Sequence, residues 1–204
     1  MRKIGLYFGS FNPITTAHEY VANYVLEHCQ IDEVQFIISP QNPHKQNQYM
    51  VDSNIRVEMV EEVCRQYNNL FINTIELTLP IPSYTANTLK AIEESFEPNI
   101  EYYIIMGYDV FKQLHTWYNF ENILNYNIIL LPRNDIYNEN DFNTYVQFLQ
   151  GKINKEVNVN YLHNMKLLNI SSTQVRNAIH NNLPLNEMVN PNVLKIIKKY
   201  ELYK

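Results

Sequence analysis

The chain has 204 residues, of which 46% are hydrophobic and 18% charged, and its formal net charge is −5. This balance fits a globular protein and excludes a largely disordered one, while the acidic charge argues against bulk binding to nucleic acid. No apolar run reaches the ~18 residues of a membrane span, and two cysteines without metal-ligand spacing suit a reducing compartment, so we expect a cytoplasmic protein.

Apolar patterning predicts strands and helices in alternation. The first half gives a strand at 3–8, a helix at 18–29, a strand at 33–39, a helix from 52 or 53 to about 67, a short strand at 71–77 and a helix at 85–95. The second half gives a strand at 102–106, short helices at 109–114 and 120–124, a strand at 128–131, a helix at 141–149, one or two strand segments within 157–168, and helices at 172–181 and 191–200. Such alternation is typical of a parallel, doubly wound α/β sheet.

We expect one domain over 1–204, with 169–204 as a small C-terminal helical portion. Ligands of such sheets bind at the carboxyl ends of the strands, where the strand order reverses. Gly9, segment 40–45, segment 107–109 and Arg133 each follow a predicted strand. These four should therefore converge on one edge of the sheet.

Residues 9–18 read GSFNPITTAH and follow the first strand directly. Gly9 lets the backbone approach a ligand closely. Thr15 and Thr16 are candidate helix caps, and a helix that begins there presents free N–H groups to an anion. His18 at that helix start can donate a hydrogen bond to a phosphate oxygen. The alternative is an ordinary strand–turn–helix with a packed histidine.

Residues 169–176 read NISSTQVR. Ser171, Ser172 and Thr173 supply hydroxyls where a helix begins, and Arg176 follows one turn later on the same face. Free N–H groups, hydroxyls and a guanidinium together suit a polyphosphate. The alternative is a simple capping run with a solvated arginine.

Further candidates follow other predicted strands. Lys45, in the loop segment 40–45 (PQNPHK), could pair with a substrate phosphate, and Asp109 after Gly107 could accept hydrogen bonds from ribose hydroxyls. Trp117 could stack on a heteroaromatic ring. The alternatives are an exposed loop lysine and a core tryptophan.

Several common site motifs are absent from the sequence. A G-x-x-x-x-G-K-[ST] segment does not occur, so the chain is not a P-loop protein. No G-x-G-x-x-G follows the first strand, which argues against a dehydrogenase, and no G-x-S-x-G elbow occurs.

The order and spacing of these motifs, with segment 83–89 (SYTANTL) and segment 116–118 (TWY), resemble the nucleotidyltransferase superfamily with the (H/T)-x-x-H and I-S-S-T-x-x-R signatures. Within it the chain is similar to the bacterial-type nicotinate-nucleotide adenylyltransferases. Thr15 and Ala17 stand where that group usually has His and Gly, and here the first loop is similar to that of the eukaryotic nicotinamide-nucleotide adenylyltransferases.

The resemblance implies a Rossmann-like nucleotidyltransferase fold and an enzyme of NAD biosynthesis. Its reaction would transfer the adenylyl group of ATP to nicotinate mononucleotide, giving nicotinate adenine dinucleotide and pyrophosphate. Alternatives are a preference for nicotinamide mononucleotide, another nucleotidyltransferase of the superfamily, a nucleotide-binding module without catalysis, and a structural role.

The resemblance also implies residue roles. The catalytic group would be His18, Thr15 and Arg176. The ATP-binding group would be Gly9, Ser10, Phe11, Gly107, Asp109, Arg133, Ile170, Ser171, Ser172 and Thr173. The mononucleotide-binding group would be Asn42, Lys45, Thr85, Trp117 and Tyr118. Mg²⁺ is expected to arrive with ATP, without a metal site on the protein. No nucleic-acid or membrane partner is expected, and the oligomeric state is open.

Overall fold

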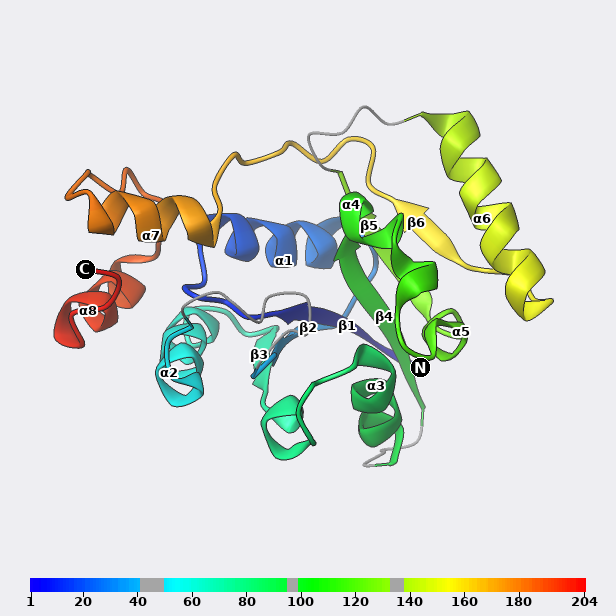
Figure 1. Ribbon diagram of the computed structural model, residues 1–204, viewed down its shortest axis with the longest axis horizontal. Helices are drawn as coiled ribbons and strands as arrows, with labels where there is room; N and C mark the ends of the chain where they lie inside the picture. Colours follow the sequence, from blue (N-terminus) through cyan, green and yellow to red (C-terminus); the bar gives the residue numbers. More distant parts are fainter. Residues whose placement is uncertain (41–49, 95–98, 133–137) are drawn as a thin grey trace.

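Six parallel strands form one sheet in the structure, a computed structural model that describes residues 1–40, 50–94, 99–132 and 138–204 (Figure 1). The strands are β1 (Arg2–Gly9), β2 (Glu33–Ile38), β3 (Leu70–Asn73), β4 (Ile100–Gly107), β5 (Asn127–Leu131) and β6 (Val159–Tyr161). Their order across the sheet is β3-β2-β1-β4-β5-β6. The predicted doubly wound parallel sheet is confirmed.

The helices follow the predicted order. They are α1 (Thr16–His28), α2 (Ser53–Cys64), α3 (Thr85–Glu94), α4 (Tyr108–Phe111), α5 (Phe120–Ile123), α6 (Glu139–Ile153), α7 (Ser172–His180) and α8 (Pro191–Lys199). Short 3₁₀ helices, η2 (Ile75–Thr78) and η3 (Leu114–Thr116), precede α3 and follow α4. In Figure 1, α7 and α8 (orange to red) lie at the left of the molecule, and α4 to α6 (green to yellow) lie at the right.

The chain reverses its direction across the sheet between β1 and β4. From β1 it moves outward through β2 to β3, and it returns to the other side of β1 as β4 before moving outward again. The register pairs Gly9 with Ile38 and Tyr7 with Ile105. The carboxyl ends of β1 and β4 therefore flank the crevice in which parallel sheets bind ligands.

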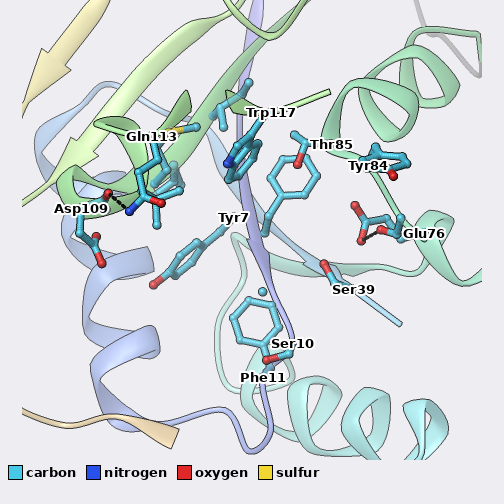
Figure 2. A pocket seen from close by; sticks show the side chains of 18 of the residues that line it. Tyr7, Ser10, Phe11, Ser39, Glu76, Tyr84, Thr85, Asp109, Gln113 and Trp117 are labelled. Carbon is cyan, nitrogen blue, oxygen red and sulfur yellow. Dashed lines mark hydrogen bonds between the residues drawn. The ribbon is translucent and has the colours of Figure 1, made fainter. Parts of the chain in front are cut away.

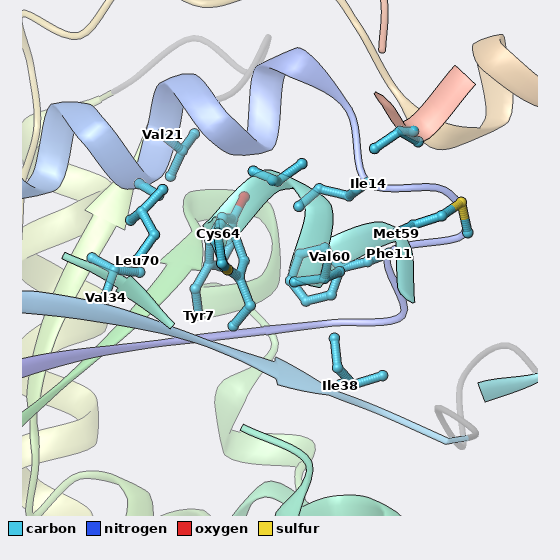
Figure 3. Close-up of a cluster of buried hydrophobic side chains, with 14 of the residues drawn as sticks. Tyr7, Phe11, Ile14, Val21, Val34, Ile38, Met59, Val60, Cys64 and Leu70 are labelled. Carbon is cyan, nitrogen blue, oxygen red and sulfur yellow. The ribbon is translucent and has the colours of Figure 1, made fainter. Parts of the chain in front are cut away.

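Alternate residues of the central strands feed two hydrophobic clusters, one on each face of the sheet. Tyr7 and Ile38 belong to a cluster with side chains from α1, α2, α7 and α8, part of which Figure 3 shows. Leu6 and Ile37 belong to a second cluster with side chains from α3, α4, α5 and α6. Both faces are thus covered by helices, which explains the continuous apolar runs in the strands.

Two predicted strands are shorter in the structure. The strand expected at 71–77 ends at Asn73, because Asn73 Oδ1 accepts a hydrogen bond from the Ile75 amide over 3.0 Å and the chain turns into η2. Within 157–168, pairing with β5 covers Val159–Tyr161, and the segment after it runs as an irregular connection to α7. The predicted strands are too long because the apolar pattern continues past the last residue that pairs with a neighbouring strand.

The C-terminal portion packs into the same core as the first helix. Val175 of α7 and Ile196 of α8 share the cluster that holds Val21 of α1. Asn190 caps α8 by accepting a hydrogen bond from the Asn192 amide, and Pro191 occupies the first helical position. Within the described ranges, no helix combines the length and apolarity that crossing a membrane requires.

Candidate active site

A cavity of about 600 Å³ opens at the carboxyl ends of β1 and β4 (Figure 2). It lies at the reversal in strand order, where the predicted site should be. Ten of the residues expected from the sequence line it: Gly9, Ser10, Phe11, His18, Thr85, Gly107, Asp109, Trp117, Tyr118 and Ser172. Residues separated by more than 160 positions are thereby brought together.

His18 is the third residue of α1, and Thr15, which caps the helix, holds its ring. The Thr15 amide N–H donates to His18 Nδ1 over 3.0 Å, and Thr15 Oγ1 lies 2.8 Å from the same nitrogen. Because an amide nitrogen can only donate, Nδ1 is the acceptor nitrogen of a neutral imidazole. The ring proton is then on Nε2, so His18 presents an N–H donor rather than a positive charge.

Aromatic contacts fix the plane of the His18 ring. Phe11 meets it edge to face with centroids 5.2 Å apart, and Tyr7 lies 6.0 Å away in a tilted arrangement. Thr15, by contrast, is fully buried and lies outside the lining of the cavity. The sequence placed both Thr15 and His18 in the catalytic group; the structure brings only His18 to the cavity surface and sets Thr15 directly behind it.

Gly9 is required by its neighbour Phe11. A Cβ atom at Gly9 would lie 2.7 Å from Phe11 Cζ and 2.9 Å from Cε1, closer than real Cβ contacts come. Phe11 itself has a φ of 44°, in the left-handed region that non-glycine residues seldom adopt. Its ring turns back over Gly9 and packs edge to face on Phe36 with centroids 5.3 Å apart. The loop after β1 is therefore a tightly constrained backbone segment.

One wall of the cavity is aromatic. Figure 2 shows Trp117, Thr85 and Tyr84 on the same side, with Trp117 following η3 and Thr85 beginning α3. Tyr84 and Tyr118 pack against each other with centroids 4.8 Å apart. Tyr118 is 52% exposed. A flat heteroaromatic ring fits such a wall by stacking.

Glu76 is a cavity residue that the sequence did not single out. Its side chain is 1% exposed, and its carboxylate accepts hydrogen bonds from Ser83 Oγ over 2.8 Å and from Thr88 Oγ1 over 2.7 Å. These bonds fasten the start of α3 to η2 and so position Thr85. Sequence alone gives no signal for this role, because a lone glutamate in an apolar stretch does not reveal its hydroxyl partners.

The start of α7 lies against the loop after β1. Arg176 Nη1 donates to the Asn12 carbonyl over 2.8 Å and Nη2 donates to Thr173 Oγ1 over 3.1 Å. Ser172 Oγ donates to the Pro13 carbonyl over 2.8 Å. Ser171 caps α7, and its Oγ accepts from the Gln174 amide. Segments 9–18 and 169–176, which the resemblance assigns to one ATP site, therefore contact each other in the structure.

A second, smaller cavity of about 60 Å³ adjoins the first. Ile170, Leu168 and Pro132 contribute to its lining. Tyr7, His18 and Leu131 line both cavities. His18 thus lies at the junction between two compartments, one with the aromatic wall and one in which aliphatic side chains are mixed with polar groups.

Three of the predicted site residues, Asn42, Lys45 and Arg133, lie outside the described residues. Among the residues described, there is no group of three or more His, Cys, Asp or Glu side chains that could hold a metal ion.

Comparison with known proteins gives the family. Residues 6–178 match the sequence model of the cytidylyltransferase-like family. A protein of Christiangramia forsetii named "Probable nicotinate-nucleotide adenylyltransferase" is 34% identical over 206 residues, covering 100% of this chain and 99% of the relative. The chain belongs to the nicotinate-nucleotide adenylyltransferase family.

Other relatives agree with this membership and confirm the family resemblance. The nicotinate-nucleotide adenylyltransferase relative from Flavobacterium psychrophilum is 36% identical over 99% of both chains. The nicotinic acid mononucleotide adenylyltransferase of Plasmodium falciparum, solved in complex with NaAD, has a TM-score of 0.76 at 20% identity, covering 100% of this chain and 98% of that one. This likeness extends the shared fold over the full length of the enzyme.

Proposed function

We propose that the enzyme transfers the adenylyl group of ATP to nicotinate mononucleotide, giving nicotinate adenine dinucleotide and pyrophosphate in NAD biosynthesis. The observation that carries the proposal is the position of His18 at the junction of the two cavities. The compartment with Trp117 suits a pyridine ring, and the compartment lined by Ile170 suits adenine. The reacting phosphates then meet beside His18.

The reaction needs no nucleophile from the protein. A phosphate oxygen of the mononucleotide forms a bond to the α-phosphorus of ATP, and the bond from that phosphorus to the bridging oxygen breaks as pyrophosphate leaves. The attacking phosphate monoester is largely ionised at neutral pH, since its second pKa is about 6. Catalysis therefore consists of positioning and of stabilising charge on the phosphoryl oxygens.

His18 stabilises that charge as a neutral Nε2–H donor. Thr15 acts through His18, because its amide and hydroxyl both lie at Nδ1. Arg176 and the hydroxyls of Ser171, Ser172 and Thr173 hold the β- and γ-phosphates that leave. Mg²⁺ accompanies ATP, bound mainly by phosphate oxygens and water, and supplies further charge neutralisation.

The remaining predicted residues bind the nucleosides. Gly107 and Asp109 contact the ribose of ATP, and the resemblance assigns Arg133, outside the described residues, to ATP binding. The resemblance assigns Lys45, also outside the described residues, to the phosphate of the mononucleotide and Asn42 to mononucleotide binding. These roles rest on the motif resemblance. The lining of the large cavity by Gly107 and Asp109 supports them.

The start of α3 favours the acid over the amide mononucleotide. Thr85 is the first residue of this ten-residue helix, and it lines the cavity beside Trp117. The positive end of a helix stabilises an anion by about 0.3–1 kcal/mol, and its first amides offer hydrogen bonds. A carboxylate on the pyridine ring gains from both effects, whereas a neutral amide gains only the hydrogen bonds.

The test is kcat/KM for nicotinate and nicotinamide mononucleotides with MgATP, measured by pyrophosphate release and dinucleotide formation. We expect a preference for the acid of about two- to fivefold, since the helix end stabilises the charged form by about 0.3–1 kcal/mol. A preference for the amide would refute the substrate assignment. Absence of pyrophosphate release with either mononucleotide would refute adenylyl transfer.

A further inference from the structure

A buried polar cluster lies beneath the loop that follows β1, outside the cavity. Its members are Arg56 of α2, Asn12 of the loop and Tyr203 near the C-terminus, which are 1%, 3% and 7% exposed. Nothing in the proposed reaction uses Arg56 or Tyr203. Burying a guanidinium costs free energy unless its N–H donors form hydrogen bonds. The hydrogen bonds of Arg56 therefore indicate the role of this residue.

Arg56 bonds only backbone carbonyls among the described residues. Nε donates to Val51 O over 3.0 Å, Nη1 donates to Ser10 O over 2.6 Å and to Ser39 O over 2.9 Å, and Nη2 donates to Pro40 O over 3.3 Å. The planar fork thereby joins the residues that follow β1 and β2 to the start of α2. A single ammonium group cannot reach four carbonyls in this arrangement.

The bond to Ser10 sets the direction of one peptide group. In a planar trans peptide, the C=O of one residue and the N–H of the next point in opposite directions. The Ser10 carbonyl is turned inward to Arg56. The Phe11 N–H is therefore directed away from Arg56, and Ser10 and Phe11 both line the cavity. A peptide held in this way offers an N–H to an anion.

Asn12 extends the same control to the peptide between Asn12 and Pro13. Its Oδ1 accepts hydrogen bonds from the Tyr203 hydroxyl over 2.8 Å and from the Val51 amide over 3.3 Å. With the side chain fixed, the Asn12 carbonyl receives Arg176 Nη1 over 2.8 Å. The direction in which Arg176 points thus depends on a residue that Tyr203 holds.

We propose that Arg56, with Asn12 and Tyr203, positions the phosphate-binding loop by holding the Ser10 carbonyl on the buried side, so that the Phe11 N–H faces a nucleotide phosphate. Arg56 is a positioning residue, because it acts through the loop and does not touch the substrate. The identity of the anion as a phosphate of ATP rests on the proposed function. An arginine that served stability alone would affect all ligands of the site together.

The test compares ATP with adenosine, which lacks the phosphates, in equilibrium binding to wild type and Arg56→Lys. The proposal predicts that Arg56→Lys weakens ATP at least about tenfold, since charge-assisted geometry at several carbonyls is lost, and leaves adenosine within about twofold. Equal losses for ATP and adenosine would overturn it. Because binding is measured without the mononucleotide, failure of the proposed reaction would show separately, as wild type that binds ATP but makes no dinucleotide.

Tyr203→Phe keeps the test decisive if Arg56→Lys fails to fold, because it deletes one hydroxyl and keeps the packed ring. We expect ATP binding to weaken roughly three- to tenfold, the range for one net hydrogen bond, with adenosine binding and the melting temperature nearly unchanged. Tyr200→Phe, at a residue that is 40% exposed, is the matched control and should bind ATP as wild type does. ATP binding by Tyr203→Phe equal to that of the control would overturn the part assigned to Tyr203.

Discussion

Replacing His18 by Asn and by Gln separates the two hydrogen-bonding roles of its ring. In Asn, the amide reaches the position of Nδ1 and can accept the Thr15 N–H bond that now measures 3.0 Å, but nothing occupies the position of Nε2. In Gln, the amide nitrogen reaches the position of Nε2, and the acceptor facing Thr15 is lost. The pair therefore tests whether His18 acts on the substrate or only at the start of α1.

The two roles have different expected magnitudes. Losing one preorganised donor to a transition-state oxyanion lowers kcat by about 10²–10³, or roughly 2.7–4 kcal/mol. Losing a helix-capping acceptor costs about 1 kcal/mol, which in a chain of this length lowers the melting temperature by about 2–4 °C. His18→Asn should therefore lose kcat by about 10²–10³ and keep its melting temperature. His18→Gln should keep more of its kcat and melt a few degrees lower.

The assay is steady-state pyrophosphate release at saturating MgATP and mononucleotide, with thermal unfolding of the same samples. If, as proposed, Arg176 and the hydroxyls at the start of α7 hold the leaving phosphates, KM for ATP should change much less than kcat. If His18→Asn turned over at near wild-type rate, the assignment of Nε2 as the phosphate donor would be refuted. If both variants lost stability and activity in parallel, His18 would be a capping residue only.

Three further predictions follow from the core and the cavity. Burial raises the pKa of Glu19, whose carboxylate accepts a hydrogen bond from Asn190 Nδ2. The folded state therefore binds the Glu19 carboxyl proton more tightly than the unfolded state does. The resulting contribution to the free energy of unfolding is present below the unfolded pKa of about 4.3 and is lost as the pH rises through the raised pKa of the folded state. The melting temperature of Glu19→Gln should rise relative to that of wild type as pH increases from about 4 to 7, and a constant difference would contradict the burial argument. Gly9→Ala should destabilise by about 1–3 kcal/mol in urea unfolding through its clash with the Phe11 ring, and an unchanged midpoint would show that the ring moves freely. Trp117→Ala should raise KM for the mononucleotide more than KM for ATP, and equal rises would indicate a structural tryptophan.

The order of the elements could be predicted because it depends on local patterning. Strand β1 is a short apolar run that ends at Gly9, and α7 follows a serine that caps it. The end of β3 could not be predicted. It depends on Asn73, whose side chain turns the chain by bonding the Ile75 amide, and on Glu76, which finds its hydroxyl partners seven and twelve residues later.

The candidate site could be predicted in part: ten of the predicted residues line the cavity, because short motifs follow the strands whose ends converge. The structural reasons for some of these residues could not be predicted. Gly9 was expected to permit the approach of a ligand, which stays a prediction, and the structure adds that the Phe11 ring leaves no room for a Cβ. Arg56 lies in no recognisable sequence motif. Its partners are backbone carbonyls, which every residue has, so no sequence pattern identifies them.

The hydrogen bond between Tyr203 and Asn12 joins positions 191 residues apart and has a consequence for protein synthesis. Tyr203 is synthesised 191 residues after Asn12, so the loop remains without this partner while all of those residues are made. Native contacts of such separation form late, since the loop between them must first be closed. A nascent chain would therefore reach its full affinity for ATP only when Tyr203 is free to fold back onto Asn12, and chains that stop before Tyr203 would hold ATP more weakly by at least the roughly three- to tenfold of one hydrogen bond.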